Sequence, residues 1–126
     1  MTAIHSKKIF VVDDDPMVTE LLYDQLAEKG GHDVTIFSTG EDCLGRLDEN
    51  PDIIILDYYL NSVKKDAADG MEILQFIKLN YPKIQIIMLS SLEKHRTVTQ
   101  IVEHGAQQFV FKDEGAFEKI AKLIRV

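Results

Sequence analysis

The sequence predicts an α/β domain of the doubly wound (βα)5 type, in which an open five-stranded parallel sheet carries helices on both faces. Short apolar runs alternate with amphipathic stretches from one end of the chain to the other. Most of these runs are continuously apolar, as expected for strands that helices cover on both faces. There are five runs, too few for a closed eight-stranded barrel. We therefore expect one open sheet.

Each apolar run is expected to form one strand. The five runs are Lys8–Val12, Val34–Phe37, Ile53–Leu56, Ile84–Leu89 and Phe109–Phe111. Because crossovers between parallel strands are right-handed, the intervening helices should fall on both faces of the sheet.

Five helices are expected, and each begins after a residue whose side chain can cap it. The capping residues are Asp15, Thr39, Asp69, Ser91 and Asp113. Pro16 suits the first turn of the first helix, which should stop at Gly30. The second helix should carry Leu47 and end before Pro51, and the fourth should close at Gly105.

Size and composition point to one domain spanning residues 1–126, with no second domain. The chain has 126 residues, of which 45% are hydrophobic and 28% charged, the mix of an ordinary soluble globule. Its single cysteine, Cys43, excludes an intramolecular disulfide and a four-cysteine zinc site.

The net charge and the hydropathy of the chain also indicate which binding partners and which cellular location to expect. A net charge of -7 would repel nucleic acid phosphates, so we expect no direct nucleic acid binding. There is no apolar signal segment at the N-terminus and no run of 18 apolar residues. We therefore expect a cytoplasmic protein that does not insert into membranes.

Polar residues follow four of the expected strands. Asp13 and Asp14 follow the first strand, Asp57 the third, Ser90 the fourth and Lys112 the fifth. In open parallel sheets, ligands bind beyond the carboxyl ends of the strands, at the point where the strand order reverses. These side chains are therefore expected to share one cleft.

Such a cleft has the parts needed for phosphoryl transfer to an aspartate. Carboxylates about 4 Å apart repel each other by about 4 kcal/mol at an effective dielectric constant near 20, so a proton or cation must neutralise them. Ligand sets made only of oxygen favour Mg²⁺, which also binds phosphate. Lys112 adds a mobile positive charge and Ser90 a hydroxyl, beside a carboxylate nucleophile.

At this point the chain resembles the receiver domains of two-component response regulators. The strings VVDDDP, IIILD, DGMEIL, IIMLSS and FVFK occur in receiver order and at receiver spacing, and the likeness covers residues Lys8 to Val126. The resemblance implies a sheet with strand order 2-1-3-4-5.

The resemblance also implies a phosphoacceptor and a metal site. Asp57 corresponds to the phosphoacceptor, while Asp13 and Asp14 correspond to the acidic pair that holds Mg²⁺. The backbone carbonyl of Tyr59 would be a further ligand of the metal. The phosphoryl group would come from a histidine kinase or a histidine phosphotransfer protein.

Three more positions correspond to the signalling machinery of receivers. Ser90 would hydrogen-bond the phosphoryl group, Lys112 would pair with it, and Phe109 holds the aromatic switch position. The resemblance implies that the face formed by the fourth helix, fifth strand and fifth helix then changes. A downstream protein, which the sequence does not identify, would read that change.

The chain departs from the usual receiver pattern in three ways. It ends with the fifth expected helix, so we expect no output domain to follow. Lys112 is followed by Asp113 rather than proline, so the usual cis peptide bond is not expected there. The loop Asn61 to Asp69 is longer than usual and lacks the common proline, and we expect it to be mobile.

Three other functions remain open at this stage. A degenerate receiver would act as a fixed interaction domain, although every position needed for chemistry holds a competent residue. A haloacid-dehalogenase-like phosphohydrolase would place its nucleophile after the first strand and would need a longer chain. A flavodoxin-type FMN carrier would need a phosphate-binding loop rich in Ser, Thr and Gly after the first strand. In this chain three aspartates, which would repel the phosphate, occupy that position.

Overall fold

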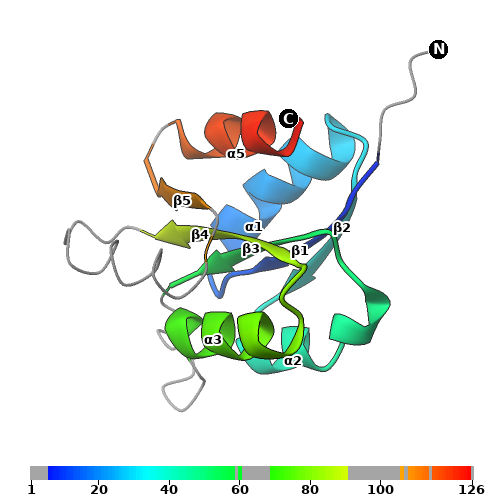
Figure 1. Ribbon diagram of the computed structural model, residues 1–126. Coiled ribbons are helices and arrows are strands. Elements are labelled where there is room, and N and C mark those ends of the chain that lie inside the picture. The colour runs from blue at the N-terminus through cyan, green and yellow to red at the C-terminus, as the bar shows by residue number, and fades with distance from the viewer. Residues whose placement is uncertain are drawn as a thin grey trace.

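A five-stranded parallel sheet forms the centre of the computed structural model, which describes residues 6–58, 60, 69–90, 106, 108–113 and 115–125. The strand order is β2-β1-β3-β4-β5, and every neighbouring pair is parallel. This confirms the expected doubly wound sheet (Figure 1).

The strands lie within one residue of the apolar runs that predict them. They are β1 (Lys8–Val12), β2 (Asp33–Phe37), β3 (Ile53–Asp57), β4 (Gln85–Ser90) and β5 (Gln108–Phe111). All five residues of β3 are buried, since it lies at the centre of the sheet with helices above and below.

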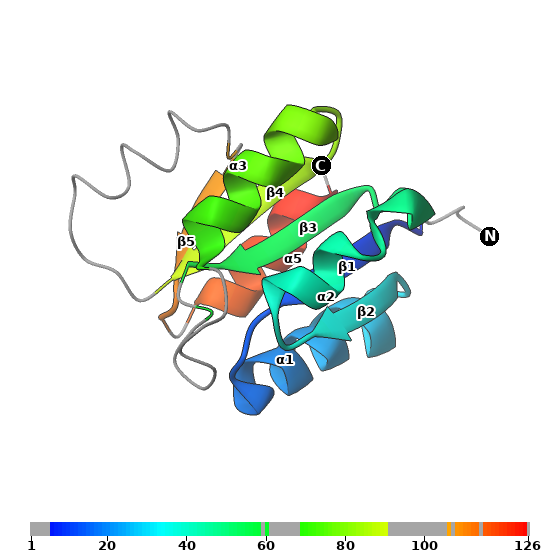
Figure 2. The same ribbon diagram turned by 90° about the horizontal axis from the view of Figure 1, so that it is seen from below.

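Helices cover both faces of the sheet (Figures 1 and 2). One face carries α1 (Pro16–Tyr23) and α5 (Ala116–Arg125), and the other carries α2 (Gly40–Leu44) and α3 (Gly70–Asn80). Each layer has its own apolar core, one centred on α2 and α3 and the other on α1 and α5. The expected fourth helix, Ser91 to Gly105, lies outside the described residues, as does most of the 61–69 loop.

The first helix is capped as expected but changes its winding before it ends. The Asp15 side chain accepts a hydrogen bond from the backbone N–H of Met17 at 3.0 Å. After α1 the chain forms a π-helix, Asp24–Glu28, in place of the expected α-helix up to Gly30. Its wider turn is seen in the 3.0 Å bond from the Lys29 N–H to the Asp24 carbonyl.

Two other helix predictions need correction. The second helix ends at Leu44, and Leu47 lies in a separate 3-10 turn, Leu47–Glu49. The last helix begins only at Ala116, later than a cap at Asp113 predicts, and the Asp113 side chain accepts the N–H of Gly115 at 3.0 Å just before it. Within the described part of the chain, no peptide bond is cis and no helix is long and apolar enough to cross a membrane.

We expect Thr39→Ala to lower the free energy of unfolding by about 1 kcal/mol, or the melting temperature by roughly 3 to 6 °C. The Thr39 hydroxyl accepts the backbone N–H of Asp42 at 3.2 Å and so caps α2. Thr39→Ser keeps this oxygen and serves as the control. Equal losses in the two variants, measured by urea unfolding, would assign the effect to the buried methyl group instead of the cap.

Candidate functional site

The carboxyl ends of three strands bring Asp13, Asp57 and Lys112 together. Asp13 follows β1, Asp57 is the last residue of β3, and Lys112 follows β5. The two aspartate side chains are only 1% and 4% exposed. The structure therefore places these charged groups inside the protein, at the carboxyl ends of the strands, where the sequence predicts them.

Three carboxylates form the acidic part of this site. One oxygen from each of Asp13, Asp14 and Asp57 lies within 4.8 Å of the others. Asp13 Oδ2 is fully buried and accepts no hydrogen bond of good geometry, although it lies 2.9 Å from Lys112 Nζ. A buried oxygen with spare acceptor capacity, beside two other carboxylates, suits a hard cation that prefers oxygen ligands.

Lys112 is the cation that these carboxylates hold. Its Nζ lies 2.9 Å from Asp13 Oδ2 and 3.3 Å from Asp57 Oδ2. Burial acts to lower the pKa of Lys112, but the nearby carboxylates of Asp57 and Asp13 outweigh it, and the net shift is upward. Lys112 therefore remains charged throughout the physiological range.

The carboxyl group of Asp13 is in the opposite situation, because burial raises its pKa and Asp14 adds to the increase. Lys112 and the backbone N–H of Asp15, which donates to Asp13 Oδ1 at 2.9 Å, reduce the increase without cancelling it. The ionised site therefore holds more negative charge than its surroundings compensate, and further positive charge there would stabilise it.

Backbone contacts fix the positions of these side chains. The Asp13 N–H donates to the Phe37 carbonyl at 3.1 Å, which joins β1 to the end of β2. The Tyr58 N–H donates to the Leu89 carbonyl at 3.2 Å, which holds the end of β3 against β4. The charged groups thus stand on strand ends that are hydrogen-bonded to their neighbours.

The other predicted site residues are placed less completely. Ser90 ends β4 at the same edge of the sheet, with its backbone paired to Phe111 of β5, while its side chain is not among those described. Tyr59 lies outside the described residues. Phe109 is half-buried in β5, where its ring lies 4.9 Å from that of Phe111 in an edge-to-face arrangement.

One residue close to the site was not among the predicted ones. The Gly70 N–H donates to the Tyr58 carbonyl at 2.7 Å, directly after Asp57. The only sequence signal is the Asp69-Gly70 pair at the start of α3, which by itself predicts a helix start and nothing more. The contact depends on the tertiary fold and could not be seen in the sequence.

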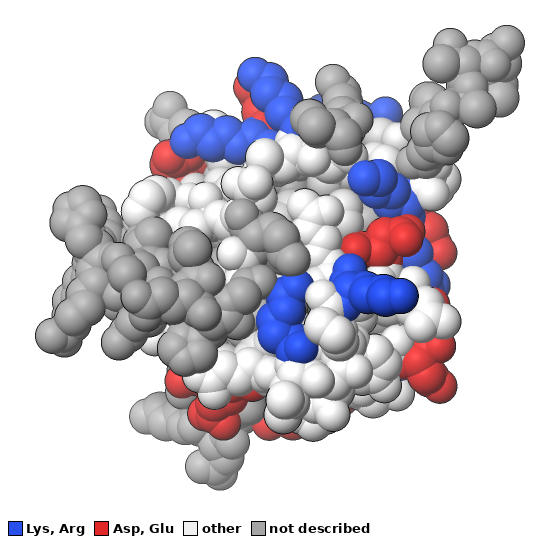
Figure 3. All heavy atoms as spheres, viewed as in Figure 1, with Lys and Arg blue, Asp and Glu red and all other residues white. Residues whose placement is uncertain are grey.

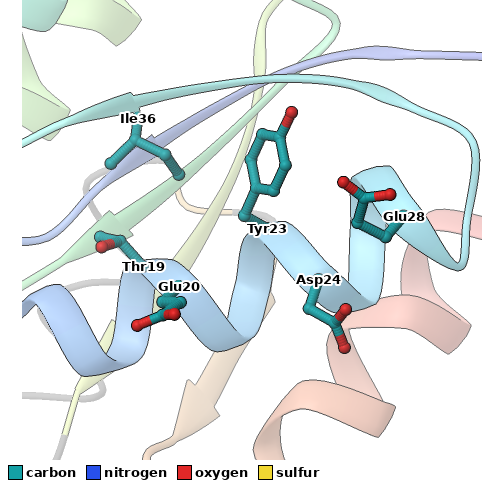
Figure 4. Close-up of a pocket in the computed structure, with 6 residues that line it drawn as sticks. All are labelled: Thr19, Glu20, Tyr23, Asp24, Glu28 and Ile36. Atoms are coloured by element: carbon teal, nitrogen blue, oxygen red, sulfur yellow. The ribbon is translucent and has the colours of Figure 1, made fainter.

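A separate hollow lies between α1, the π-helix and β2 (Figure 4). Its volume is about 390 Å³, and it shares no residue with the acidic site. Its lining residues are Thr19, Glu20, Tyr23, Asp24, Glu28 and Ile36.

On the face shown in Figure 3, basic and acidic side chains of the described residues are interspersed.

Comparison with known proteins identifies the family. Residues 9–125 match the model of the response regulator receiver domain. The chain belongs to this family. It is 31% identical over 109 residues to the probable C4-dicarboxylate response regulator DctR of Bacillus subtilis (strain 168). The match covers 83% of this chain and 45% of the relative, so the receiver chain spans less than half of that protein.

Solved receiver domains have the same fold. The BeF3-activated receiver domain of DrrB, a Thermotoga maritima protein, superposes with a TM-score of 0.79 at 30% identity, covering 95% of this chain and 96% of that one. The receiver domain of NtrX from Brucella abortus gives a TM-score of 0.79 at 25% identity, covering 93% and 95%.

These findings confirm the expected fold and family. The chain is a receiver domain of a two-component response regulator, a signalling domain, and membership implies a kinase as phosphoryl donor. A haloacid-dehalogenase-like hydrolase is not favoured. Receiver domains generally bind Mg²⁺ in an acidic pocket, and this chain has an aspartate cluster of that kind.

Proposed function

We propose that this receiver accepts a phosphoryl group on Asp57 from a histidine kinase or a histidine phosphotransfer protein. One observation carries the proposal: the buried Asp57 carboxylate lies within 4.8 Å of two other carboxylates and 3.3 Å from the Lys112 ammonium. A carboxylate nucleophile thus stands beside groups that can bind the charge of an incoming phosphoryl group.

Asp13, Asp14 and Asp57 would hold Mg²⁺, with the backbone carbonyl of Tyr59 as a further ligand. The exclusively oxygen donor set and the spare acceptor capacity of the buried Asp13 Oδ2 support this assignment. When bound, Mg²⁺ supplies positive charge that neutralises the carboxylates and the phosphoryl oxygens.

In the transfer, a carboxylate oxygen of Asp57 attacks phosphorus. The bond between phosphorus and the donor nitrogen breaks, and its electron pair stays with the donor. Lys112 can then exchange a carboxylate oxygen for a phosphoryl oxygen, and the Ser90 hydroxyl can donate a hydrogen bond to another. The same groups would assist the later hydrolysis of the phosphoaspartate.

The signal would pass from the site through β5. Movement of Ser90 and Lys112 toward the phosphoryl group leaves room that Phe109 can enter, which remodels the face around β5 and α5 for a downstream protein.

We further propose that residues 1–126 act as a single receiver domain. We also propose that this domain acts in the cytoplasm, as the sequence leads us to expect.

Phosphorylation by acetyl phosphate in the presence of Mg²⁺ tests this function. Intact-mass measurement should show one added phosphoryl group on the wild type and none on Asp57→Asn, because the amide is not a nucleophile. Asp48→Asn, which neutralises an exposed aspartate, is the matched control and should react like the wild type. Addition of the phosphoryl group to Asp57→Asn, or an undiminished reaction in EDTA, would refute the proposal.

A further inference from the structure

Gly70, the first residue of α3, lies against the backbone of the phosphoacceptor strand. A Cβ built on Gly70 would overlap the Asp57 carbonyl oxygen and lie 2.7 Å from Tyr58 Cα. The Gly70 N–H donates to the Tyr58 carbonyl at 2.7 Å, so the approach is held by a hydrogen bond. The atoms in the way belong to the backbone, which cannot move aside as a flexible side chain can.

The backbone conformation of Gly70 does not itself require glycine. Among the described residues, only Gly31 and Asn50 have a positive φ. At the first position of a helix, alanine would also be a better helix former than glycine. Space, and not conformation, is therefore the reason for a glycine here.

Neither side of this contact is free to move away. The end of β3 is held by the neighbouring strand β4, where Asp57 pairs with Leu89. On the opposite side, α3 is anchored in the core by Ile73, Leu74 and Ile77, which are at most 1% exposed. An added methyl group must therefore displace the strand end, the helix start or both.

We infer that Gly70 is a positioning residue for phosphoryl transfer. Its missing side chain lets α3 close onto the strand end, and this contact sets the Asp57 carboxylate relative to Asp13 and Lys112. The inference rests on the proposed function of Asp57. A displacement of about 1 Å at a reacting group can reduce a rate about 100-fold, so a small shift here has a large effect.

Gly70→Ala should test this against Gly40→Ala. A Cβ on Gly40 would overlap the side chain of Ile73, so this control also crowds α3, but away from Asp57. For Gly70→Ala we expect phosphorylation by acetyl phosphate to slow by at least about tenfold and Mg²⁺ binding, measured by calorimetry, to weaken by a similar factor. Gly40→Ala should keep both within about twofold of the wild type, although its free energy of unfolding falls as well.

Mg²⁺ affinity separates positioning from stability, because it is measured on folded protein. If either variant melts near the working temperature, all proteins are compared in trimethylamine N-oxide, which favours the folded state. A Gly70→Ala protein within twofold of the wild type in rate and affinity would overturn the inference. So would equal losses in Gly40→Ala. If the wild type itself is not phosphorylated, the proposed function fails, and the affinities alone decide the role of Gly70.

Discussion

The metal-free Lys112→Met protein should unfold at pH 7 with a free energy about 3 kcal/mol below that of the wild type. Lys112 Nζ lies 2.9 Å from Asp13 and 3.3 Å from Asp57, and both carboxylates are buried. Removing the ammonium leaves these charges uncompensated, which costs more than the ion pairs themselves contribute. Urea unfolding in EDTA measures the loss, and Lys119→Met, at an exposed ion pair with Asp113, should change little.

The pH dependence of this loss identifies its cause. Since the folded-state pKa of Lys112 is raised, its stabilisation is present below the ordinary pKa of 10.5 and is lost as the pH rises through the folded value. In acid the carboxylates become protonated, so the deficit of Lys112→Met should shrink. Mg²⁺ should also restore part of the lost stability. A deficit that is constant with pH and insensitive to Mg²⁺ would show that Lys112 acts only through packing.

Asp13→Asn should have opposite effects on stability and on phosphoryl transfer. The pKa of Asp13 is raised by burial, so its ionised form opposes folding above that pKa, and stability recovers as the pH falls through it. The amide removes repulsion from two carboxylates and attraction to one ammonium. We expect a net gain of about 1 kcal/mol in metal-free protein at pH 7.

The same substitution removes a ligand of the proposed Mg²⁺ site. Phosphorylation by acetyl phosphate should slow about 100-fold, equivalent to about 2.7 kcal/mol of barrier. Asp48→Asn, at an exposed position, is the control for both measurements and should alter stability by less than about 0.5 kcal/mol. A destabilised Asp13→Asn protein, or one that reacts at the wild-type rate, would contradict this account of the site.

The strands were predictable because a strand that is buried on both faces consists of a continuous run of apolar residues. In β3 every residue is buried, and the run of isoleucines and leucine matches that environment directly. The helices were less predictable. Leu22 and Leu26 are both buried, and their spacing fits an α-helix as well as the π-helix that follows Tyr23. Whether a helical turn takes the wider π form depends on packing that the sequence does not reveal.

For the site, the sequence predicted which residues gather but not how they pair. Asp13, Asp57 and Lys112 follow neighbouring or nearby strands, so their meeting follows from the parallel order. The contact of Lys112 with both aspartates depends on side-chain geometry across β1, β3 and β5. The closeness of Gly70 to Asp57 likewise arises only when α3 packs on the sheet.

The strand order also bears on how the chain folds while it is being synthesised. In β2-β1-β3-β4-β5, β2 pairs with β1, β3 adds to the other side of β1, and β4 and β5 then extend that same side. Each strand that leaves the ribosome therefore meets a free edge, and none must insert between two strands already paired. A nascent chain can extend its sheet in the order of translation, which reduces the time for which unpaired apolar strands are exposed to aggregation.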